Sequence, residues 1–227
     1  MPDSTKLQPV TPTQLAQQQR GGALILDTRP AEQFAARHIR GSIQISLLGN
    51  FASWAAIILD PEQKLLLIVE DLNGAREAYN RLARAGLRAV IGYSFADENE
   101  WRKAGLDLAI ISIERCEQIR QTLQSDSSLQ LVDVRSRAEW LRGHLPGAIS
   151  LPLLDLDPKK QVIDPSKPSL VYCYEGFRAT TAASILLRES TADIGILIDG
   201  VEGWSALGLP LESEFRTIEF PPVLRNR

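Results

Sequence analysis

The sequence predicts an α/β protein made of two tandem domains, each a parallel sheet with helices on both faces. Short apolar segments of strand length alternate with longer segments of helical character, a pattern that favours parallel strands joined by helices. The same order of segments then occurs a second time within the 227 residues. The composition, with 44% hydrophobic and 23% charged residues, is that of an ordinary globular protein.

The repeat is defined by short motifs that occur in the same order in both halves. The matching pairs are Asp27-Thr28-Arg29 with Asp133-Val134-Arg135, His38-Ile39-Arg40-Gly41-Ser42-Ile43 with His144-Leu145-Pro146-Gly147-Ala148-Ile149, Asp71-Leu72-Asn73-Gly74-Ala75-Arg76 with Cys173-Tyr174-Glu175-Gly176-Phe177-Arg178, and Trp101 plus Gly105-Leu106 with Trp204 plus Gly208-Leu209. Their nearly constant offset of about a hundred residues indicates a duplication and is too long for a solenoid repeat. We place the first domain at residues 1–109 and the second at 110–227. Because the boundary segment Asp107–Ile111 is apolar, we expect the two halves to pack together.

In the first half, the strongest local signal is a helix start. Thr11, Pro12 and Gln14 suit the N-cap, the first helical position and the capping-box partner, and Gly21-Gly22 would end that helix. Apolar runs predict strands at 23–26, 65–69 and 89–91, and another runs on from the turn at 38–43. The segments between them predict helices at 30–36, 51–59, 73–85 and 98–104.

The second half repeats this order. Ser112 is a candidate N-cap for a helix through Leu123. Strands are expected at 129–132, 169–172 and 194–198, a further one follows the turn at 143–149, and helices are expected at 137–141, 179–187 and 201–207. A polar, proline-bearing loop from Asp155 to Pro168 precedes the strand at 169–172.

The candidate active site is the loop between that strand and the next helix. Backbone N–H groups at such a turn carry partial positive charge, so they would favour a sulfur anion on Cys173. Arg178 closes the loop with a fixed cation, whereas the Glu175 carboxylate opposes a second anion. We take Cys173 and Arg178 as candidate catalytic residues; an ion pair within the domain is an equal alternative for Arg178. The candidate substrate-binding residues of the loop are Tyr174, Glu175, Gly176 and Phe177.

These motifs together resemble those of tandem rhodanese-like proteins over both halves. They are the Asp-x-Arg after a strand, the Gly143-His144-x-Pro146-Gly147-Ala148 turn, the Cys-x-x-Gly-x-Arg loop, and Trp204 followed by Gly208-Leu209-Pro210. The resemblance implies a five-stranded parallel sheet in each half. It also implies transfer of a sulfane sulfur from thiosulfate or a persulfide to a thiol or cyanide through a Cys173 persulfide. Arg135 joins the candidate substrate-binding residues, although a buried charged pair of this kind is more often structural.

The first half also resembles the rhodanese region that accompanies metallo-β-lactamase-like persulfide dioxygenase domains, at the segment Gly49-Asn50-Phe51-Ala52-Ser53-Trp54. A partner carrying that metal domain is therefore a candidate. Asp71 stands where the second half has Cys173, and a carboxylate is a poor sulfur acceptor. We expect the first domain to be catalytically inactive, with Gly74 and Arg76 preserving the shape of its loop.

Two other functions compete with sulfur transfer by an enzyme. The protein could be a non-enzymatic sulfur carrier or docking module that presents a persulfide to a partner. It could also be a cysteine phosphatase or arsenate reductase, but those loops place five residues between Cys and Arg, and this loop has four. For Cys116, burial is the expected role, and a resolving thiol for Cys173 is the alternative.

Several classes are disfavoured by composition. A net charge of -3 gives no reason to expect a nucleic-acid partner, and no apolar run reaches membrane-spanning length. Cys116 and Cys173 do not form a disulfide framework, and residues 1–8 lack the apolar core of a signal peptide, so we expect a reducing, cytoplasmic location. His38 and His144 are too few for a histidine-based metal site, and we expect no metal and no cofactor.

Overall fold

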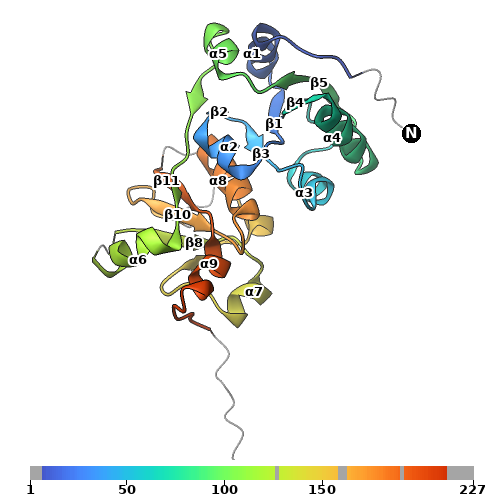
Figure 1. The fold of residues 1–227 in the computed structure, drawn as a ribbon. Helices are drawn as coiled ribbons and strands as arrows, with labels where there is room; N and C mark the ends of the chain where they lie inside the picture. The colour runs from blue at the N-terminus through green and yellow to red at the C-terminus, as the bar shows by residue number, and fades with distance from the viewer. Residues whose placement is uncertain (1–6, 126–127, 158–162, 190–191, 214–227) are drawn as a thin grey trace, which may run out of the picture.

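The computed structural model describes residues 7–125, 128–157, 163–189 and 192–213, and it contains two stacked α/β lobes (Figure 1). The elements of the first lobe are α1 (Pro12–Arg20), β1 (Leu24–Asp27), α2 (Ala31–Ala36), β2 (His38–Ile39), β3 (Ile43–Gln44), α3 (Phe51–Ile58), β4 (Leu65–Val69), α4 (Leu72–Arg84), β5 (Val90–Phe95), α5 (Glu98–Lys103) and β6 (Leu108–Ala109). Those of the second are β7 (Ile113–Glu114), α6 (Cys116–Ser125), β8 (Gln130–Asp133), α7 (Arg137–Arg142), β9 (Ile149–Ser150), η2 (Leu153–Asp155), β10 (Ser169–Tyr172), α8 (Phe177–Glu189), β11 (Ile194–Leu197) and α9 (Gly200–Ala206).

The two sheets are parallel but differ in size. The second-half sheet has five strands in the order β7-β11-β10-β8-β9, as the sequence predicts. Among the described residues, the first-half sheet has four strands, in the order β3-β1-β4-β5, one fewer than the expected five. In place of the fifth strand, Pro9 makes an isolated parallel bridge to Tyr93. The bridge is made by the Val10 N–H and the Gln8 carbonyl, and on its C-terminal side it is followed by α1, which begins at Pro12.

Helices cover both faces of each sheet, and alternate strand residues point to opposite faces. In the first half, Leu65 and Leu67 of β4 pack with residues of α3 and α4, whereas Leu66 and Ile68 pack with Leu15 of α1 and Trp101 of α5. All five β4 side chains are buried, which explains its continuous apolar sequence. In the second half, one face packs against α8 and the other against α6 and α9.

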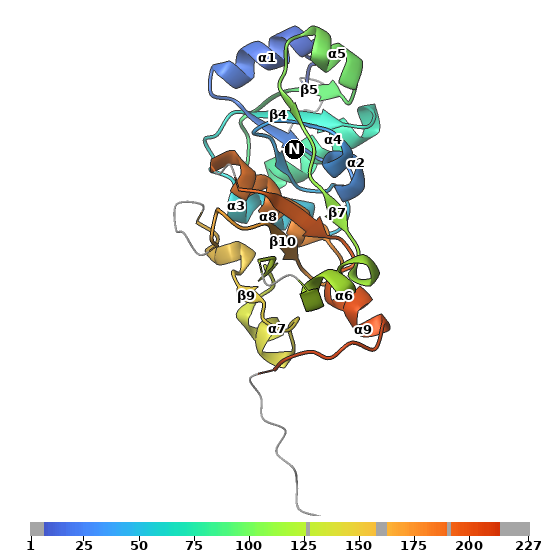
Figure 2. The same cartoon turned by 90° about the vertical axis from the view of Figure 1, so that its left-hand side faces the viewer.

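The two lobes share one core through α8. Phe34 and Ala35 of α2 belong to the same buried cluster as Ala182 and Leu186 of α8. The boundary residue Ile111 is buried in this cluster, and its backbone N–H donates to the carbonyl of Ala35 at 2.9 Å. Figure 2 shows α8 between the two halves, with the chain that connects them passing along the outside to β7. The packing of the halves that the apolar boundary predicts is therefore present.

The edge of the first sheet nearest the second half is hydrogen-bonded to a side chain of α8. β3 is the edge strand, and the backbone N–H of Gln44 donates to Ser184 Oγ at 3.0 Å. Ser184 in turn donates to the carbonyl of Thr181 at 2.7 Å. An unpaired edge group is thus satisfied across the boundary between the halves, which fixes their relative position.

His38 makes the stability of the protein depend on pH. Its ring is buried, stacks on Phe34 with centroids 4.1 Å apart, and hydrogen-bonds through Nδ1 to the Phe34 carbonyl. Burial, together with the cations of Arg29, Arg40 and Arg37, lowers the pKa of His38 from 6.5 to about 4.

Between those two pH values the unfolded chain binds a proton on His38 that the folded chain does not. The free energy of unfolding is therefore expected to fall by about 3 kcal/mol as the pH falls from 6.5 to 4. Urea unfolding of wild type and His38→Gln at pH 7 and pH 4.5 measures this contribution. The variant should lose less stability than wild type; an equal loss would contradict the assignment to His38.

Candidate active site

Cys173 follows the carboxyl end of β10, as the first residue of the four-residue loop that leads to α8. Its Sγ accepts a hydrogen bond from the Gly176 N–H at 3.1 Å, and the residue is only 2% exposed. Gly176 has a φ of 87°, and a Cβ there would lie 2.5 Å from the Ile198 carbonyl oxygen. Glycine is therefore required both for the backbone conformation and for the close approach of β11's end. The loop thus places one backbone N–H, that of Gly176, against the sulfur.

The N-terminus of α9 supports the other side of this loop. The N–H groups of Val201 and Glu202 donate to the carbonyls of Cys173 and Tyr174, at 3.0 and 3.2 Å. Gly200 has a φ of 48°, and a Cβ there would lie 2.2 Å from the Cys173 oxygen. The first N–H groups of a helix need partners outside it, and here the loop supplies them. Sequence reasoning did not single out Gly200, although an Asp199-Gly200 pair after a strand is a recognisable turn signal.

Arg178 is held in an ion pair within the second domain. Its guanidinium donates to both carboxylate oxygens of Glu139 on α7, at 2.8 and 2.7 Å. This pair lowers the pKa of Glu139 to about 2 and raises the pKa of Arg178. Glu139 also closes the capping box of α7 with Ser136. The ion-pair alternative for Arg178 is thus the geometry observed, and the arginine ties α8 to α7 beside the cysteine loop.

Arg135 is buried beneath the loop. Its Nε and Nη2 donate to the Asp133 carboxylate, at 2.9 and 2.6 Å, and Nη2 also donates to the Gly143 carbonyl at 2.6 Å. The side chain is 5% exposed. These contacts join the end of β8 to the turn after α7. They correspond to the structural role that the sequence offers as the alternative to substrate binding by Arg135. Arg135 is not among the residues that line a cavity beside the loop.

In the first half, the equivalent of the cysteine loop has a different shape. Asp71 is the N-cap of α4, and its Oδ1 accepts from the Gly74 N–H at 2.7 Å, where Cys173 Sγ accepts from Gly176. However, α4 begins directly at Leu72, and Gly74 lies within it with no positive φ. The expectation that Gly74 and Arg76 preserve the loop is therefore wrong. A carboxylate is a strong N-cap, so it draws the helix forward by one turn and removes the loop.

Beside the cysteine loop, the two halves enclose a pocket of about 450 Å³. Glu175, Phe177, Arg178 and Thr181 line it from the second half. The first half contributes the segment between β3 and α3 and the start of α3, namely Ile45, Ser46, Leu48, Gly49, Asn50, Phe51 and Trp54. Cys173, Tyr174 and Gly176 are not among the lining residues; Cys173 is buried within the loop, and Tyr174 is exposed.

The first-half wall of this pocket is held by Arg81 of α4. Its guanidinium donates to the carbonyls of Leu47 and Gly49, at 2.6 and 2.7 Å, and lies over the Phe51 ring. Phe51 is fully buried, as expected for a core aromatic, whereas Trp54 is half-buried and reaches both domain cores. In the sequence, the segment 49–54 is distinguished only by its resemblance, and its place in a pocket depends on the packing of the two halves.

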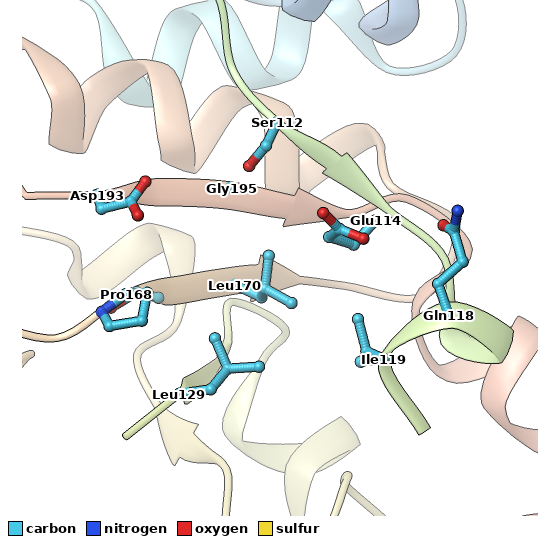
Figure 3. Close-up of a pocket in the computed structure, with 10 residues that line it drawn as sticks. Ser112, Glu114, Gln118, Ile119, Leu129, Pro168, Leu170, Asp193 and Gly195 are labelled. Atoms are coloured by element: carbon cyan, nitrogen blue, oxygen red, sulfur yellow. The ribbon is translucent and has the colours of Figure 1, made fainter. Parts of the chain in front are cut away.

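A second cavity, of about 270 Å³, lies at the other end of the second sheet (Figure 3). Figure 3 shows Ser112 on one side of Gly195 in β11 and Leu170 of β10 on the other, with Asp193 and Pro168 just before these two strands. Pro168, Leu170, Asp193 and Gly195 are at the amino ends of β10 and β11, opposite the Cys173 loop. Open α/β sheets bind their ligands beyond the carboxyl ends of the strands, so the pocket between the halves is the better candidate.

Cys116 is fully buried at the start of α6. Its thiol donates to the Gly200 carbonyl at 3.3 Å, and its backbone N–H donates to the Asp199 carboxylate. Burial, followed by the contact with Asp199, raises the pKa of this thiol. The carboxylate of Asp199 caps α6, so the expectation that Ser112 caps this helix is wrong. These contacts give Cys116 a packing role beneath Gly200.

Two further observations concern metal sites and membrane-spanning helices. Within the described ranges, no group of histidine, cysteine, aspartate or glutamate side chains has the arrangement of a metal site. In the same part of the chain, no helix combines the length and apolar character that crossing a bilayer requires.

The comparisons with known proteins agree with this geometry. The model of the rhodanese-like domain matches residues 11–94 and 116–207. A putative sulfur carrier protein, YrkF of Bacillus subtilis, is 25% identical over 89 residues, which are 39% of this chain and 48% of that protein. The thiosulfate sulfurtransferase GlpE of Coxiella burnetii is 32% identical over 76 residues, 34% of this chain and 71% of that protein.

Among solved structures, a thiosulfate sulfurtransferase from Pseudomonas aeruginosa aligns with 91% of this chain and 44% of its own, at 20% identity and a TM-score of 0.37. The chain thus spans about half the length of some of the proteins it matches. The family model nevertheless covers most of the chain, in one stretch of each half. The chain therefore belongs to the rhodanese-like family, as a tandem of two rhodanese-like domains.

Proposed function

We propose that the protein is a sulfurtransferase that carries a sulfane sulfur on Cys173 from a small donor to a thiol or cyanide. The observation that carries this proposal is the position of the Cys173 sulfur at the carboxyl end of β10, where the Gly176 N–H already donates to it at 3.1 Å. Sulfur-transferring relatives in the same family support the reaction class.

The reaction consists of two displacements. The Cys173 thiolate attacks the outer sulfur of thiosulfate; the S–S bond of the donor breaks, sulfite leaves with its electron pair, and Cys173 becomes a persulfide anion. An acceptor thiolate or cyanide then attacks the outer sulfur of that persulfide, and the Cys173 thiolate leaves. In both steps the electron pair of the broken S–S bond stays with the leaving group. The transferred sulfur keeps its oxidation level, so no external oxidant or reductant is needed. Such double displacement gives ping-pong kinetics.

The loop supports this chemistry through its backbone. The Gly176 N–H contacts the sulfur, and α9 fixes the carbonyls of Cys173 and Tyr174 so that they point away from it. Donors that are already oriented stabilise an anion without reorganising during the reaction. Arg178 acts through the position of α8, since Glu139 uses its guanidinium.

A protein partner is the second candidate, favoured by the apolar side chains exposed around the loop. Leu48, Tyr174 and Phe177 are 62%, 46% and 48% exposed. They would suit a sulfur carrier that docks on another protein, and a metallo-β-lactamase-like persulfide dioxygenase is one such partner. The phosphatase alternative gains no support, because the loop around Sγ is short and Glu175 is exposed on it.

The proposed function is tested by intact mass after brief exposure to thiosulfate or an organic persulfide. Wild type should gain about 32 Da, one sulfur atom, and Cys173→Ser should gain none. Cys116→Ser is the matched control and should gain the sulfur as wild type does, because Cys116 is fully buried and a serine hydroxyl can keep its hydrogen bond to the Gly200 carbonyl. A wild type that gains nothing, while Cys173 is still alkylated by iodoacetamide, would show that the chemistry is not sulfur transfer.

The same measurement tests the inactive first domain. Asp71→Cys in the Cys173→Ser background should remain free of added sulfur, because losing the Asp71 cap does not supply the N–H groups of a second helix start that hold the Cys173 loop in the second half. A 32 Da gain by this double variant would show that residue 71 alone decides the activity of the first half.

A further inference from the structure

We propose that the first domain selects the sulfur donor, and that the pocket between the halves takes an organic persulfide whose body is neutral or carries an ammonium group. Inorganic dianions such as thiosulfate would be poor donors. This inference rests on the proposed function and adds the donor class to it.

The charges of the pocket support this selection. Among the described residues that line it, the charged side chains are Glu175 and Arg178. Arg178 is neutralised by its two hydrogen bonds to Glu139. Glu175, Arg178 and Glu139 together therefore carry one net negative charge, which is that of Glu175. A dianion approaching this pocket is repelled, whereas a neutral donor is not and an ammonium group is attracted.

The size and chemistry of the pocket fit an organic body. A volume of about 450 Å³ lies within the range of sites for organic ligands and far exceeds the space of one small inorganic ion. The wall from the first domain offers the half-buried ring of Trp54 and the exposed side chain of Leu48. Asn50 is the N-cap of α3 but makes no side-chain capping bond, so its carboxamide can donate to and accept from a bound ligand.

The wall is rigid enough to discriminate between donors. Arg81 fixes the carbonyls of Leu47 and Gly49 on one side of the pocket. On the other, Gln44 is bonded to Ser184 of α8, whose first turn carries Phe177 and Arg178. The selecting surface and the cysteine loop are therefore joined through α8, and Glu175 of the loop itself lines the pocket.

The loading step balances with such a donor. The Cys173 thiolate attacks the outer sulfur of R–S–SH, the S–S bond of the donor breaks, and RS⁻ leaves and takes up a proton from solvent. Cys173 then carries the persulfide. Only the leaving group differs from the thiosulfate reaction, and it is this group that the pocket would contact.

The test measures the second-order rate constant for the 32 Da gain with three donors: thiosulfate, the persulfide of mercaptoethanol, and the persulfide of cysteamine, which carries an ammonium group. In Glu175→Gln, the rate with thiosulfate should rise about three- to tenfold, the rate with cysteamine persulfide should fall by a similar factor, and the rate with mercaptoethanol persulfide should stay the same. Comparing variants for each donor cancels the intrinsic reactivities of the donors. Glu117→Gln, an exposed carboxylate on α6 outside the pocket, is the matched control.

A second variant tests the contribution of the first domain. Trp54→Ala should slow both organic donors about tenfold and leave thiosulfate within twofold, because only the organic bodies contact this wall. Ile57→Ala, an exposed residue of the same helix, should change none of the three rates. Equal effects on all donors, in either Glu175→Gln or Trp54→Ala, would overturn the donor selection while leaving sulfur transfer intact. Absence of the 32 Da gain with every donor would instead overturn the proposed function itself.

Discussion

Gly200→Ala is expected to slow the loading of Cys173 with sulfur about 100-fold, the scale of loss that accompanies a misplacement of about 1 Å at a reacting group. A Cβ at position 200 would lie 2.2 Å from the Cys173 oxygen and 2.8 Å from the Tyr174 oxygen. Both atoms are backbone, so they cannot move aside without displacing the loop. The residue would also have to adopt a φ of 48°, which costs a further 1–2 kcal/mol or so.

The matched control for this variant is Gly208→Ala. Gly208 has a similar φ of 66°, but nothing lies within 4 Å of a Cβ built there. It should therefore lose stability from the backbone conformation alone and keep its rate of sulfur loading. The rate is measured by the 32 Da gain, and the stability by urea unfolding. Equal rates in the two variants would show that the contact between α9 and the loop does not position Cys173.

Arg135→Met is expected to reduce the free energy of unfolding by about 3–5 kcal/mol, because it leaves a buried carboxylate without its partner. Asp133 is 1% exposed, and Arg135 supplies its hydrogen bonds from Nε and Nη2. The repeat offers a second copy of the experiment, since Asp27 and Arg29 form the same pair at 2.6 Å. Arg29→Met should therefore cost a similar amount.

The control for these variants is a surface pair. Arg40 and Asp107 are also 2.6 Å apart, but their side chains are 61% and 69% exposed. Arg40→Met should change the stability by less than about 1 kcal/mol. Urea unfolding at pH 7 measures all three variants. If Arg135→Met cost no more than Arg40→Met, the buried pair would contribute no more to stability than the exposed one, and this prediction would be wrong.

The sequence predicts best where one local pattern determines the structure. The strands at Leu65–Val69 and Ser169–Tyr172 occur at the predicted residues, because fully buried parallel strands are short apolar runs between turns. The capping box of Thr11 and Gln14 is also present, because it depends only on two residues three positions apart. The position of the cysteine loop between β10 and α8 follows from the predicted strand and the predicted helix on either side of it.

Features that depend on distant residues could not be predicted in this way. Asp199 caps α6 from 83 positions away, so the local pattern suggested Ser112 instead. The match between Asp71 and Cys173 suggested equal loops, but a carboxylate caps a helix and a thiol does not, and α4 begins three positions earlier in the alignment than α8. The pocket wall around Trp54 depends on how the halves pack, which no segment reveals alone.

The bond between Gln44 and Ser184 has a consequence for any attempt to separate the two repeats. The edge strand β3 and the helix α2 cover α8, the helix that follows Cys173. Removing the first repeat would expose that buried face of α8. The repeat without a loop cysteine is therefore part of the environment of the repeat that carries one.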